Sequence, residues 1–277
     1  MHREPLRGRR ALLTGASTGI GRALARALAA RGVVLAVAAR REPLLRGLAE
    51  QITAAGGTAP AVLTADLARR GAAADLAERA TAALGGVDIL INNAGTGLVG
   101  GVPVLGDSDE ARASFETNLW SPIALAAALL PGMRRAGRGT VVNVTSTVQA
   151  VPLPMLGYYG AAKAALALVT RSLRHELRHT PVRVVEVVPG STDTALRDVD
   201  VLPWRGGAPP RTFRPAPPAA VAAAVVRALA AGRDRVVHPR YALVPLHVPA
   251  IGGAVAAIGA RRIDTTRADG AAYPFGP

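Results

Sequence analysis

The chain has 277 residues, half of them apolar, which is enough to bury a full hydrophobic core and indicates a packed globular protein. It contains no cysteine, which excludes disulfides, thiolate catalysis and cysteine-based metal sites. The formal net charge is +14, but the basic residues are scattered singly or in pairs with few aromatic residues among them, so no nucleic-acid partner is expected. No long apolar stretch precedes the first glycine-rich turn, so we expect no cleaved signal peptide and a cytoplasmic location.

Along the chain, apolar runs typical of strands alternate with longer Ala/Leu-rich stretches typical of helices, which is the pattern of parallel βαβ units. The predicted strands are 10–14, 33–39, a run that ends at 64 or 65, 87–92, 139–145 and 182–188, with 235–238 as a candidate seventh. The predicted helices are a first one through 31, then 43–55, 72–84, 109–135, 160–179 and 219–231. The fold class predicted is α/β, a single doubly wound domain with a parallel sheet of six to seven strands and helices on both faces.

The order of elements suggests a tail at 1–8, one catalytic domain at 9–240 and an apolar C-terminal extension at 241–277. Six prolines in 196–218 exclude a long regular element there and favour a substrate-binding loop or lid. Residues 241–260 carry no formal charge, but their prolines and glycines argue against a membrane-spanning helix. This stretch would either cover the substrate site or a subunit contact, or associate with a membrane surface.

A glycine-rich turn joins the first predicted strand to the first helix, with the sequence Thr14-Gly-Ala-Ser-Thr-Gly-Ile-Gly21. Glycines at such a turn let the backbone approach a pyrophosphate closely, and the helix N-terminus presents free N–H groups to it. A plain structural turn is the alternative, but the position between a buried strand and a helix favours a dinucleotide site of Rossmann type. The candidate cofactor residues here are Gly15, Ser17, Thr18, Gly19, Ile20 and Gly21.

The second strand ends in Ala38-Ala39-Arg40-Arg41, without the acidic residue that would bind the ribose 2′-hydroxyl of NAD. A guanidinium suits a 2′-phosphate, so Arg40 predicts NADP(H) rather than NAD(H), with Arg41 as a candidate helper. A solvated arginine pair is the alternative. Asp66 and Leu67 close the third strand and could hold an adenine ring, or Asp66 could cap the next helix.

Tyr159 and Lys163 are four residues apart, which places the phenol and the ammonium on one face of a helix. A free tyrosine has a pKa near 10, and a neighbouring cation lowers that pKa toward the range useful for acid–base catalysis. Ser146 follows the strand 139–145, at the edge where α/β sheets bind ligands, and can donate a hydrogen bond to a substrate oxygen. Each residue alone is a weak signal.

Together these features resemble the short-chain dehydrogenase/reductase family in its form of roughly 250 residues, over about residues 9–195. The resemblance rests on landmarks in the family's order: the turn 14–21, Asn92-Asn93-Ala94-Gly95, Asn118, Ser146 thirteen positions before Tyr159, Lys163, and Pro189-Gly190. It implies that Tyr159 transfers the proton, that Ser146 stabilises the substrate oxygen, and that Lys163 holds the nicotinamide ribose. It further implies a water-positioning role for Asn118, a cofactor pocket shaped by Asn93 and Gly95, and a nicotinamide contact from Pro189, Gly190, Thr192 and Thr194.

The chain departs from the family pattern in two places. Thr18 stands where some NADP-preferring members carry a basic residue, so the cofactor prediction depends on Arg40. The C-terminal residues lack the glycine-rich ending common in tetrameric members, which puts a homotetramer in doubt and leaves a homodimer through helices 109–135 and 160–179.

The function predicted is NADP(H)-dependent interconversion of a carbonyl and an alcohol on an apolar small molecule, with reduction favoured and no metal. A non-catalytic dinucleotide-binding regulator and a membrane-surface reductase of lipid-like substrates are the alternatives. The expected substrate pocket comprises Leu98, Val148, Val151, Leu153, Met155 and the segment 196–213, which includes Val199, Leu202, Trp204 and Phe213 with Arg197, Arg205 and Arg211.

Overall fold

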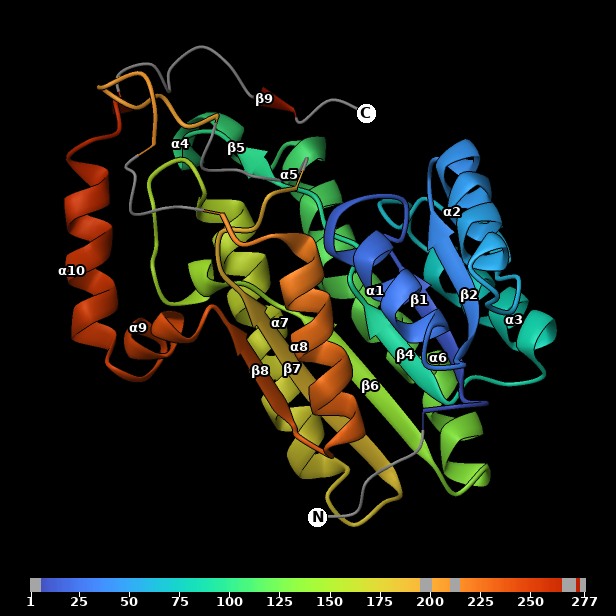
Figure 1. Ribbon diagram of the computed structural model, residues 1–277. Helices are drawn as coiled ribbons and strands as arrows, with labels where there is room; N and C mark the ends of the chain where they lie inside the picture. Colours follow the sequence, from blue (N-terminus) through green and yellow to red (C-terminus); the bar gives the residue numbers. More distant parts are fainter. Residues whose placement is uncertain (1–5, 195–200, 210–214, 266–272, 275–277) are drawn as a thin grey trace.

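The computed structural model describes residues 6–194, 201–209, 215–265 and 273–274. Within these ranges the chain forms a seven-stranded parallel sheet in the order β3-β2-β1-β4-β6-β7-β8 (Figure 1). The predicted doubly wound sheet is therefore confirmed, with its seventh strand. The strands are β1 Arg10–Thr14, β2 Val34–Ala39, β3 Ala61–Thr64, β4 Ile89–Asn92, β6 Gly139–Val144, β7 Val182–Pro189 and β8 Arg235–His238.

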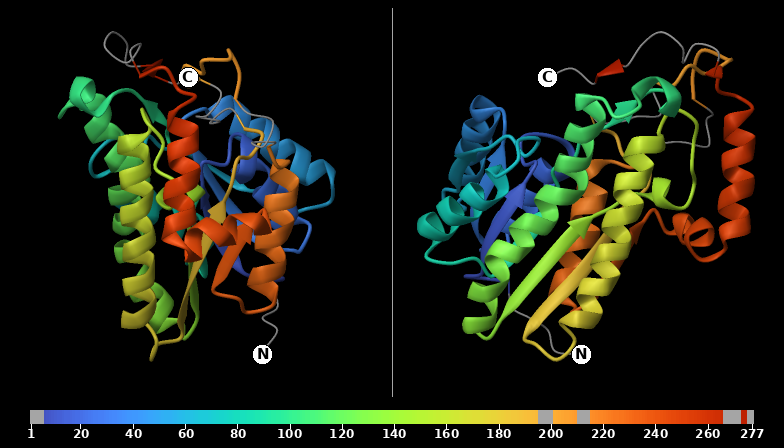
Figure 2. Two further views of the ribbon diagram at one scale, coloured as in Figure 1. Left: turned by 90° about the vertical axis from the view of Figure 1, so that its left-hand side faces the viewer. Right: turned by 180° about the vertical axis from the view of Figure 1, so that it is seen from behind.

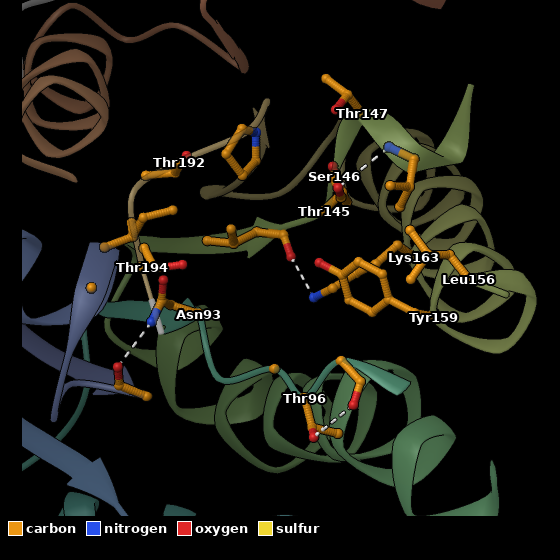
Figure 3. Close-up of a pocket in the computed structure, with 18 of the residues that line it drawn as sticks. Asn93, Thr96, Thr145, Ser146, Thr147, Leu156, Tyr159, Lys163, Thr192 and Thr194 are labelled. Atoms are coloured by element: carbon orange, nitrogen blue, oxygen red, sulfur yellow. Dashed lines mark hydrogen bonds between the residues drawn. The ribbon is translucent and has the colours of Figure 1, made fainter. Parts of the chain in front are cut away.

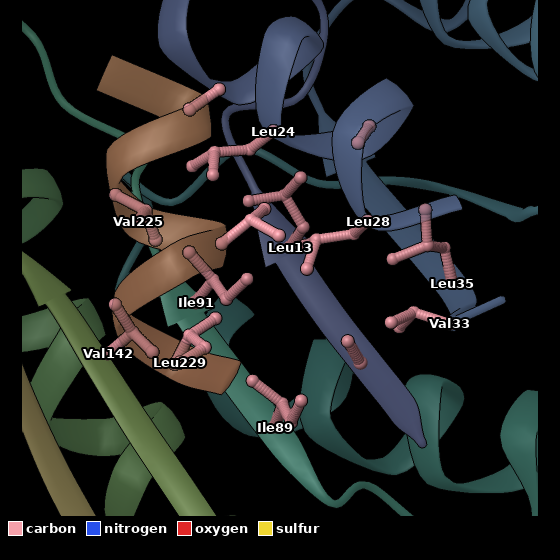
Figure 4. Packing of buried hydrophobic residues seen from close by; sticks show 14 of the residues in the cluster. Leu13, Leu24, Leu28, Val33, Leu35, Ile89, Ile91, Val142, Val225 and Leu229 are labelled. Atoms are coloured by element: carbon pink, nitrogen blue, oxygen red, sulfur yellow. The ribbon is translucent and has the colours of Figure 1, made fainter. Parts of the chain in front are cut away.

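Helices cover both faces of the sheet because successive side chains of each buried strand point to opposite sides. Leu13 and Ile91 face one layer, where α1 and α8 pack over the sheet (Figure 4), while Leu12 and Leu90 face the other. The first layer contains α1 Gly19–Ala29, α2 Glu42–Ala54 and α8 Pro218–Ala230, and the second contains α3 Ala72–Leu84, α6 Ser121–Arg135 and α7 Gly157–Glu176.

The strand order reverses between β1 and β4, which pair side by side in the middle of the sheet. From β1 the chain first proceeds outward through β2 and β3, and then returns to build β4, β6, β7 and β8 on the other side. The crevice beyond the carboxyl ends of the strands at such a reversal is where open α/β sheets bind ligands. The turn after Thr14 and the loop after Asn92 therefore meet at that crevice.

The predicted helix 109–135 is interrupted. The structure has α5 Asp109–Phe115, a π-helical turn Glu116–Trp120, and then α6. The side-chain amide of Asn118 donates to the Ser114 carbonyl oxygen, which the Asn118 backbone N–H would use in an α-helix. Pro122 has no N–H to donate to the Asn118 carbonyl. The apolar periodicity of the sequence does not report this local change in the backbone carbonyl partners, so it predicted an uninterrupted helix. π-Helical turns are frequent at functional sites.

At the opposite, amino-terminal edge of the sheet, Asp88 is fully buried between two arginines. Its carboxylate accepts from Arg10 Nη2 at 2.9 Å and Arg10 Nε at 3.1 Å, and from Arg138 Nε at 3.1 Å. Burial alone would raise the pKa of Asp88, but the hydrogen bonds from Arg10 and Arg138 outweigh it and hold that pKa well below its usual range. This cluster ties the starts of β1, β4 and β6 together.

After β8, a 3₁₀ turn at Arg240–Ala242 leads into α9 Leu243–His247 and α10 Pro249–Ala260. Figures 1 and 2 show α10 on the β8 side of the molecule, standing apart from the sheet. Among the described residues no single helix is long and apolar enough to cross a membrane. In the part of the chain that the structure describes, one pair of helical segments, Arg240–His247 and Pro249–Ala260, reaches that length and apolarity when taken together, and the two are bent by 106°.

Four further short elements were not predicted. β5 Leu98–Val99 pairs in antiparallel fashion with β9 Tyr273–Pro274, and α4 Val102–Leu105 follows β5. A 3₁₀ turn spans Thr147–Gln149 directly after Ser146. The β5–β9 pair joins segments far apart in the chain through two residues each, which leaves no periodicity to detect in the sequence.

Candidate active site

One cavity of about 1060 Å³ lies beyond the carboxyl ends of the strands. It is lined by the turn after β1, the segments that follow β2, β3, β4, β6 and β7, and parts of α7, α9 and α10. Ser146, Tyr159 and Lys163 line it. So do the other predicted cofactor residues, Gly15, Ser17, Thr18, Gly19, Ile20, Gly21, Arg40, Asp66, Leu67, Asn93, Gly95, Pro189, Gly190, Thr192 and Thr194.

The glycine turn is held in place by Asn93 and Thr14. Asn93 Nδ2 donates to the carbonyl oxygens of Thr14 at 3.0 Å and Gly15 at 3.2 Å, and Thr14 Oγ1 accepts from the N–H of Ala94 at 3.0 Å. Gly15 has φ +66°, and a Cβ there would lie 2.7 Å from Ala94 Cα. A glycine is thus required for the backbone to approach the β4 loop this closely.

The N-terminus of α1 opens onto the cavity. Its N-cap, Thr18, makes no side-chain capping bond, and its first turn has no acidic residue. The first backbone N–H groups of a helix have no intrahelical acceptor and carry the positive end of the helix dipole. These features fit the pyrophosphate of a dinucleotide.

Two arginines stand at the end of the cavity beside this turn. Arg40 and Arg41 are exposed, and Arg41 Nη2 donates to Thr18 Oγ1 at 3.4 Å. Among the described residues that line the cavity, only Asp66 and Glu110 carry carboxylates. Asp66 Oδ1 accepts from the N–H of Ala68, and α3 begins six residues after Asp66 behind the N-cap Gly71, so Asp66 does not cap that helix.

Of the four predicted catalytic residues, Ser146 follows β6, and Tyr159 and Lys163 lie on α7. Lys163 Nζ donates to the carbonyl oxygen of Val144, at the end of β6, at 3.0 Å and lies 5.9 Å from the centre of the Tyr159 ring. Ser146 Oγ accepts from the N–H of Val148 at 3.3 Å. Figure 3 shows Tyr159 and Lys163 on one side of the cavity, with Thr192 and Thr194 on the other.

Asn118 lies behind the cavity wall rather than in it, fully buried in the π-helical turn. Its Nδ2 donates to the carbonyl oxygens of Thr96 at 2.8 Å and Ser114 at 2.9 Å, while its Oδ1 has no hydrogen-bond partner among the described residues. Thr96, Ser114 and Thr117 line the cavity in front of it. A buried amide oxygen of this kind is commonly satisfied by ordered water.

The prediction of the substrate pocket was partly wrong. Leu98, Val148, Val151 and Leu153 line the cavity. Met155, Leu202 and Trp204 instead pack with Val99 and Ile263 behind the lining residues Leu153 and Leu156, in one hydrophobic cluster that keeps their large side chains out of solvent. Arg205 is exposed and does not line the cavity. Leu196, Arg197, Val199, Arg211 and Phe213 lie outside the described residues.

Sequence reasoning gave 241–260 as a cover of the substrate site or a subunit contact, but it named none of the residues that form the C-terminal wall of the cavity. That wall consists of Tyr241, Ala242, Val244, Pro245, Ile251, Val255, Ile258, Gly259 and Arg262. The spacing of Ile251, Val255 and Ile258 at i, i+4 and i+7 could have identified an apolar helix face. No local pattern could have shown that this face is turned toward Tyr159.

Residues 9–201 match the family model for short chain dehydrogenases. A short chain dehydrogenase of Pseudocercospora fijiensis is 37% identical over 194 residues, which cover 69% of this chain and 62% of that protein. The matches cover 58 to 62% of the length of three such curated relatives, so the chain spans about three fifths of them.

Two solved structures superpose on most of the chain. A short-chain dehydrogenase of Sphingobium yanoikuyae in complex with NADPH has a TM-score of 0.75 and 28% identity, and the match covers 90% of this chain and 94% of that one. A Burkholderia phymatum short chain dehydrogenase/reductase in complex with NAD has a TM-score of 0.77 at 24% identity, covers 88% of this chain and 93% of that one, and supports the fold. On the family match, the sheet order and the relatives, the chain belongs to the short-chain dehydrogenase/reductase family.

Proposed function

We propose that the protein is an NADP(H)-dependent oxidoreductase that reduces the carbonyl group of an apolar small molecule to an alcohol, or catalyses the reverse reaction. The observation that carries the proposal is the single cavity shared by the glycine turn, the Ser146–Tyr159–Lys163 set and an apolar wall. A dinucleotide and a small apolar substrate can meet in such a space. Family membership supports the same reaction class.

The preference for NADP(H) is supported by charge at the end of the cavity. Arg40 and Arg41 line the cavity, Arg41 donates to Thr18 Oγ1, and β2 ends in Ala38-Ala39, without a carboxylate that would repel a 2′-phosphate. A guanidinium forms charge-assisted, bidentate bonds with phosphate. The two solved relatives described above bind NAD in one case and NADPH in the other, so the preference depends on these side chains.

When bound, the nicotinamide supplies the hydride for the carbonyl carbon. Tyr159 donates the proton to the carbonyl oxygen, and its side chain is nearly buried, which keeps bulk water from the transfer. Lys163, anchored by the Val144 carbonyl oxygen, provides the cation that favours the resulting phenolate. Ser146 accepts the Val148 N–H, which leaves its own O–H to donate to the substrate oxygen.

Asn118 belongs to the path that returns the proton to Tyr159. Its buried Oδ1, which has no partner in the described part of the chain, and its contacts with the Thr96 and Ser114 carbonyl oxygens support a role in holding water behind Lys163. Asn118 acts through that water and is a positioning residue.

The proposal is tested by assaying NADPH oxidation with a panel of apolar ketones and aldehydes, in the wild type and in Tyr159→Phe. We expect turnover by the wild type and a loss of about 10²–10⁴-fold in kcat for Tyr159→Phe, the usual contribution of a positioned proton donor. NADPH binding, measured by fluorescence, should change far less. Cofactor binding with no turnover of any substrate, and no difference in Tyr159→Phe, would instead favour a non-catalytic regulator.

We also propose that the protein forms a homodimer. Trp120, at the end of the π-helical turn before α6, and Leu168 of α7 are exposed by 53% and 59%, and burial in a dimer would remove them from water. Light scattering of the wild type and of Leu168→Lys tests this proposal. A monomeric wild type would contradict it.

A further inference from the structure

An unusual share of exposed apolar side chains lies in one short segment. Six of the large hydrophobic side chains exposed in the described part of the chain fall between Tyr241 and Ile258. Five of them also line the cavity that holds Tyr159, and we call the four aliphatic ones the apolar stripe: Val244, Ile251, Val255 and Ile258. Contiguous apolar surface of this kind marks a binding site more often than a solvated face.

The helix α10 has three distinct faces, separated by its 3.6-residue turn. Gly252, Ala256 and Gly259 are buried on one face. A Cβ on Gly259 would lie 2.8 Å from Leu153 Cδ2, and one on Gly252 would overlap the Ala150 carbonyl oxygen. Small residues therefore let α10 pack directly on the loop 150–153, which follows the catalytic serine.

The second face carries the stripe residues Ile251, Val255 and Ile258, which point into the cavity. The third face is exposed and contains only small residues, Ala250, Gly253, Ala254 and Ala257. A helix that docked on a membrane or on a second subunit would place its large apolar residues on that outer face. The large apolar residues point into the cavity here, so we expect them to contact a ligand bound in the cavity.

The shape of the wall selects among apolar ligands. From Ile251 to Ile258 the stripe runs straight for about 10 Å, at 1.5 Å per helical residue. It continues the apolar lining that starts beside Ser146 with Val148, Val151 and Leu153. A straight wall of branched aliphatic side chains, continuous with the lining beside Ser146, matches an unbranched hydrocarbon chain.

We infer that the protein acts on long, unbranched aliphatic carbonyl compounds or alcohols, with the reacting carbon at Tyr159 and the chain lying along the stripe. This inference rests on the proposed function and adds the substrate class to it. Each methylene buried along the stripe should then raise kcat/KM by up to about fourfold, the value of its transfer from water.

The test is a homologous series of unbranched methyl ketones, from butanone to dodecanone, assayed with NADPH. We expect kcat/KM of the wild type to rise steeply with chain length and then level off. Val255→Asn should flatten the rise, with far more loss on dodecanone than on butanone. Ala254→Asn, one residue away on the outer face, is the matched control and should keep the wild-type slope. Ile258→Thr provides a second stripe variant if Val255→Asn folds poorly.

A flat profile for the wild type, with butanone reduced as well as dodecanone, would overturn this inference and leave the proposed function intact. If no ketone is reduced, the proposed function fails, and binding of the fluorescent fatty acid cis-parinaric acid decides the inference separately. If Val255→Asn binds this fatty acid more weakly than Ala254→Asn does, the result supports a hydrocarbon chain lying along the stripe. Equal binding by the two variants overturns the inference. Flotation with phosphatidylglycerol vesicles together with a flat profile would also overturn it, in favour of a membrane-docking segment.

Discussion

The glycine turn gives a prediction whose magnitude can be worked from the structure. In Gly21→Ala the new Cβ would lie 2.6 Å from Asn93 Nδ2 and would overlap the Gly15 carbonyl oxygen. Asn93 must then shift, which weakens its hydrogen bonds to the Thr14 and Gly15 carbonyl oxygens. Each bond is worth about 0.5–1.5 kcal/mol. Overpacking costs about another 1–3 kcal/mol, so the free energy of unfolding should fall by about 2–6 kcal/mol in total.

The assay is thermal unfolding followed by circular dichroism, with and without NADPH. For a chain of this length about 1 kcal/mol corresponds to roughly 2 °C, so Tm should fall by about 4–12 °C. Because the displaced atoms form the proposed phosphate site, NADPH should also bind more weakly and stabilise the variant less.

Gly47→Ala is the matched control. Gly47 is inside α2, and a Cβ there would meet nothing within 4 Å, so the substitution should leave NADPH binding unchanged and raise stability by up to about 1 kcal/mol. An unchanged Tm in Gly21→Ala would refute the packing argument. A lower Tm with unchanged NADPH affinity would refute the assignment of this turn to the cofactor.

Three further predictions concern single charges. Arg40→Asp should weaken NADPH binding by about 10–100-fold, as expected for lost bonds to a charged group, and leave NADH nearly untouched; equal loss for both cofactors in calorimetry would exclude the phosphate contact. Lys163→Met should move the pH profile of kcat to higher pH, because the phenolate of Tyr159 loses its neighbouring cation; an unmoved profile would contradict that role. The folded pKa of Asp88 lies below its unfolded value of about 3.9, so its ion pairs stabilise the fold above that pH and are lost as the pH falls below it. Asp88→Asn should therefore lose less stability than the wild type between about pH 7 and about pH 3 in urea unfolding, and equal losses would show that another group dominates.

Much of the fold could be predicted because its signals are local. Each buried strand is a short apolar run, and a glycine after several helices marks where they end, so the alternation of β and α elements follows from periodicity. The turn 14–21, Ser146 and the Tyr159–Lys163 pair could be placed because a parallel sheet gathers the carboxyl ends of its strands at one edge. Their roles in catalysis remain predictions.

The features that the sequence did not predict depend on side-chain competition or on contacts between distant segments. The π turn forms because the Asn118 side chain competes for a backbone carbonyl that a helical pattern assigns to the main chain. Leu202 and Trp204 are apolar residues of a proline-rich segment, and composition could not tell whether they face the cavity or the cluster behind it. The direction of the stripe on α10 is set by the packing of Gly252 and Gly259 on the loop 150–153.

The central claim is that this cavity passes a hydride from NADPH to an apolar carbonyl compound, with Tyr159 supplying the proton. The most direct measurement uses NADPH deuterated at the transferable position of its nicotinamide, with unbranched ketones as acceptors and mass spectrometry of the products. We predict one deuterium on the carbinol carbon of the alcohol with the wild type, and product formation at least about a hundredfold slower with Tyr159→Phe. Tight NADPH binding without deuterium in any product, or labelled alcohol formed at the wild-type rate by Tyr159→Phe, would contradict the account.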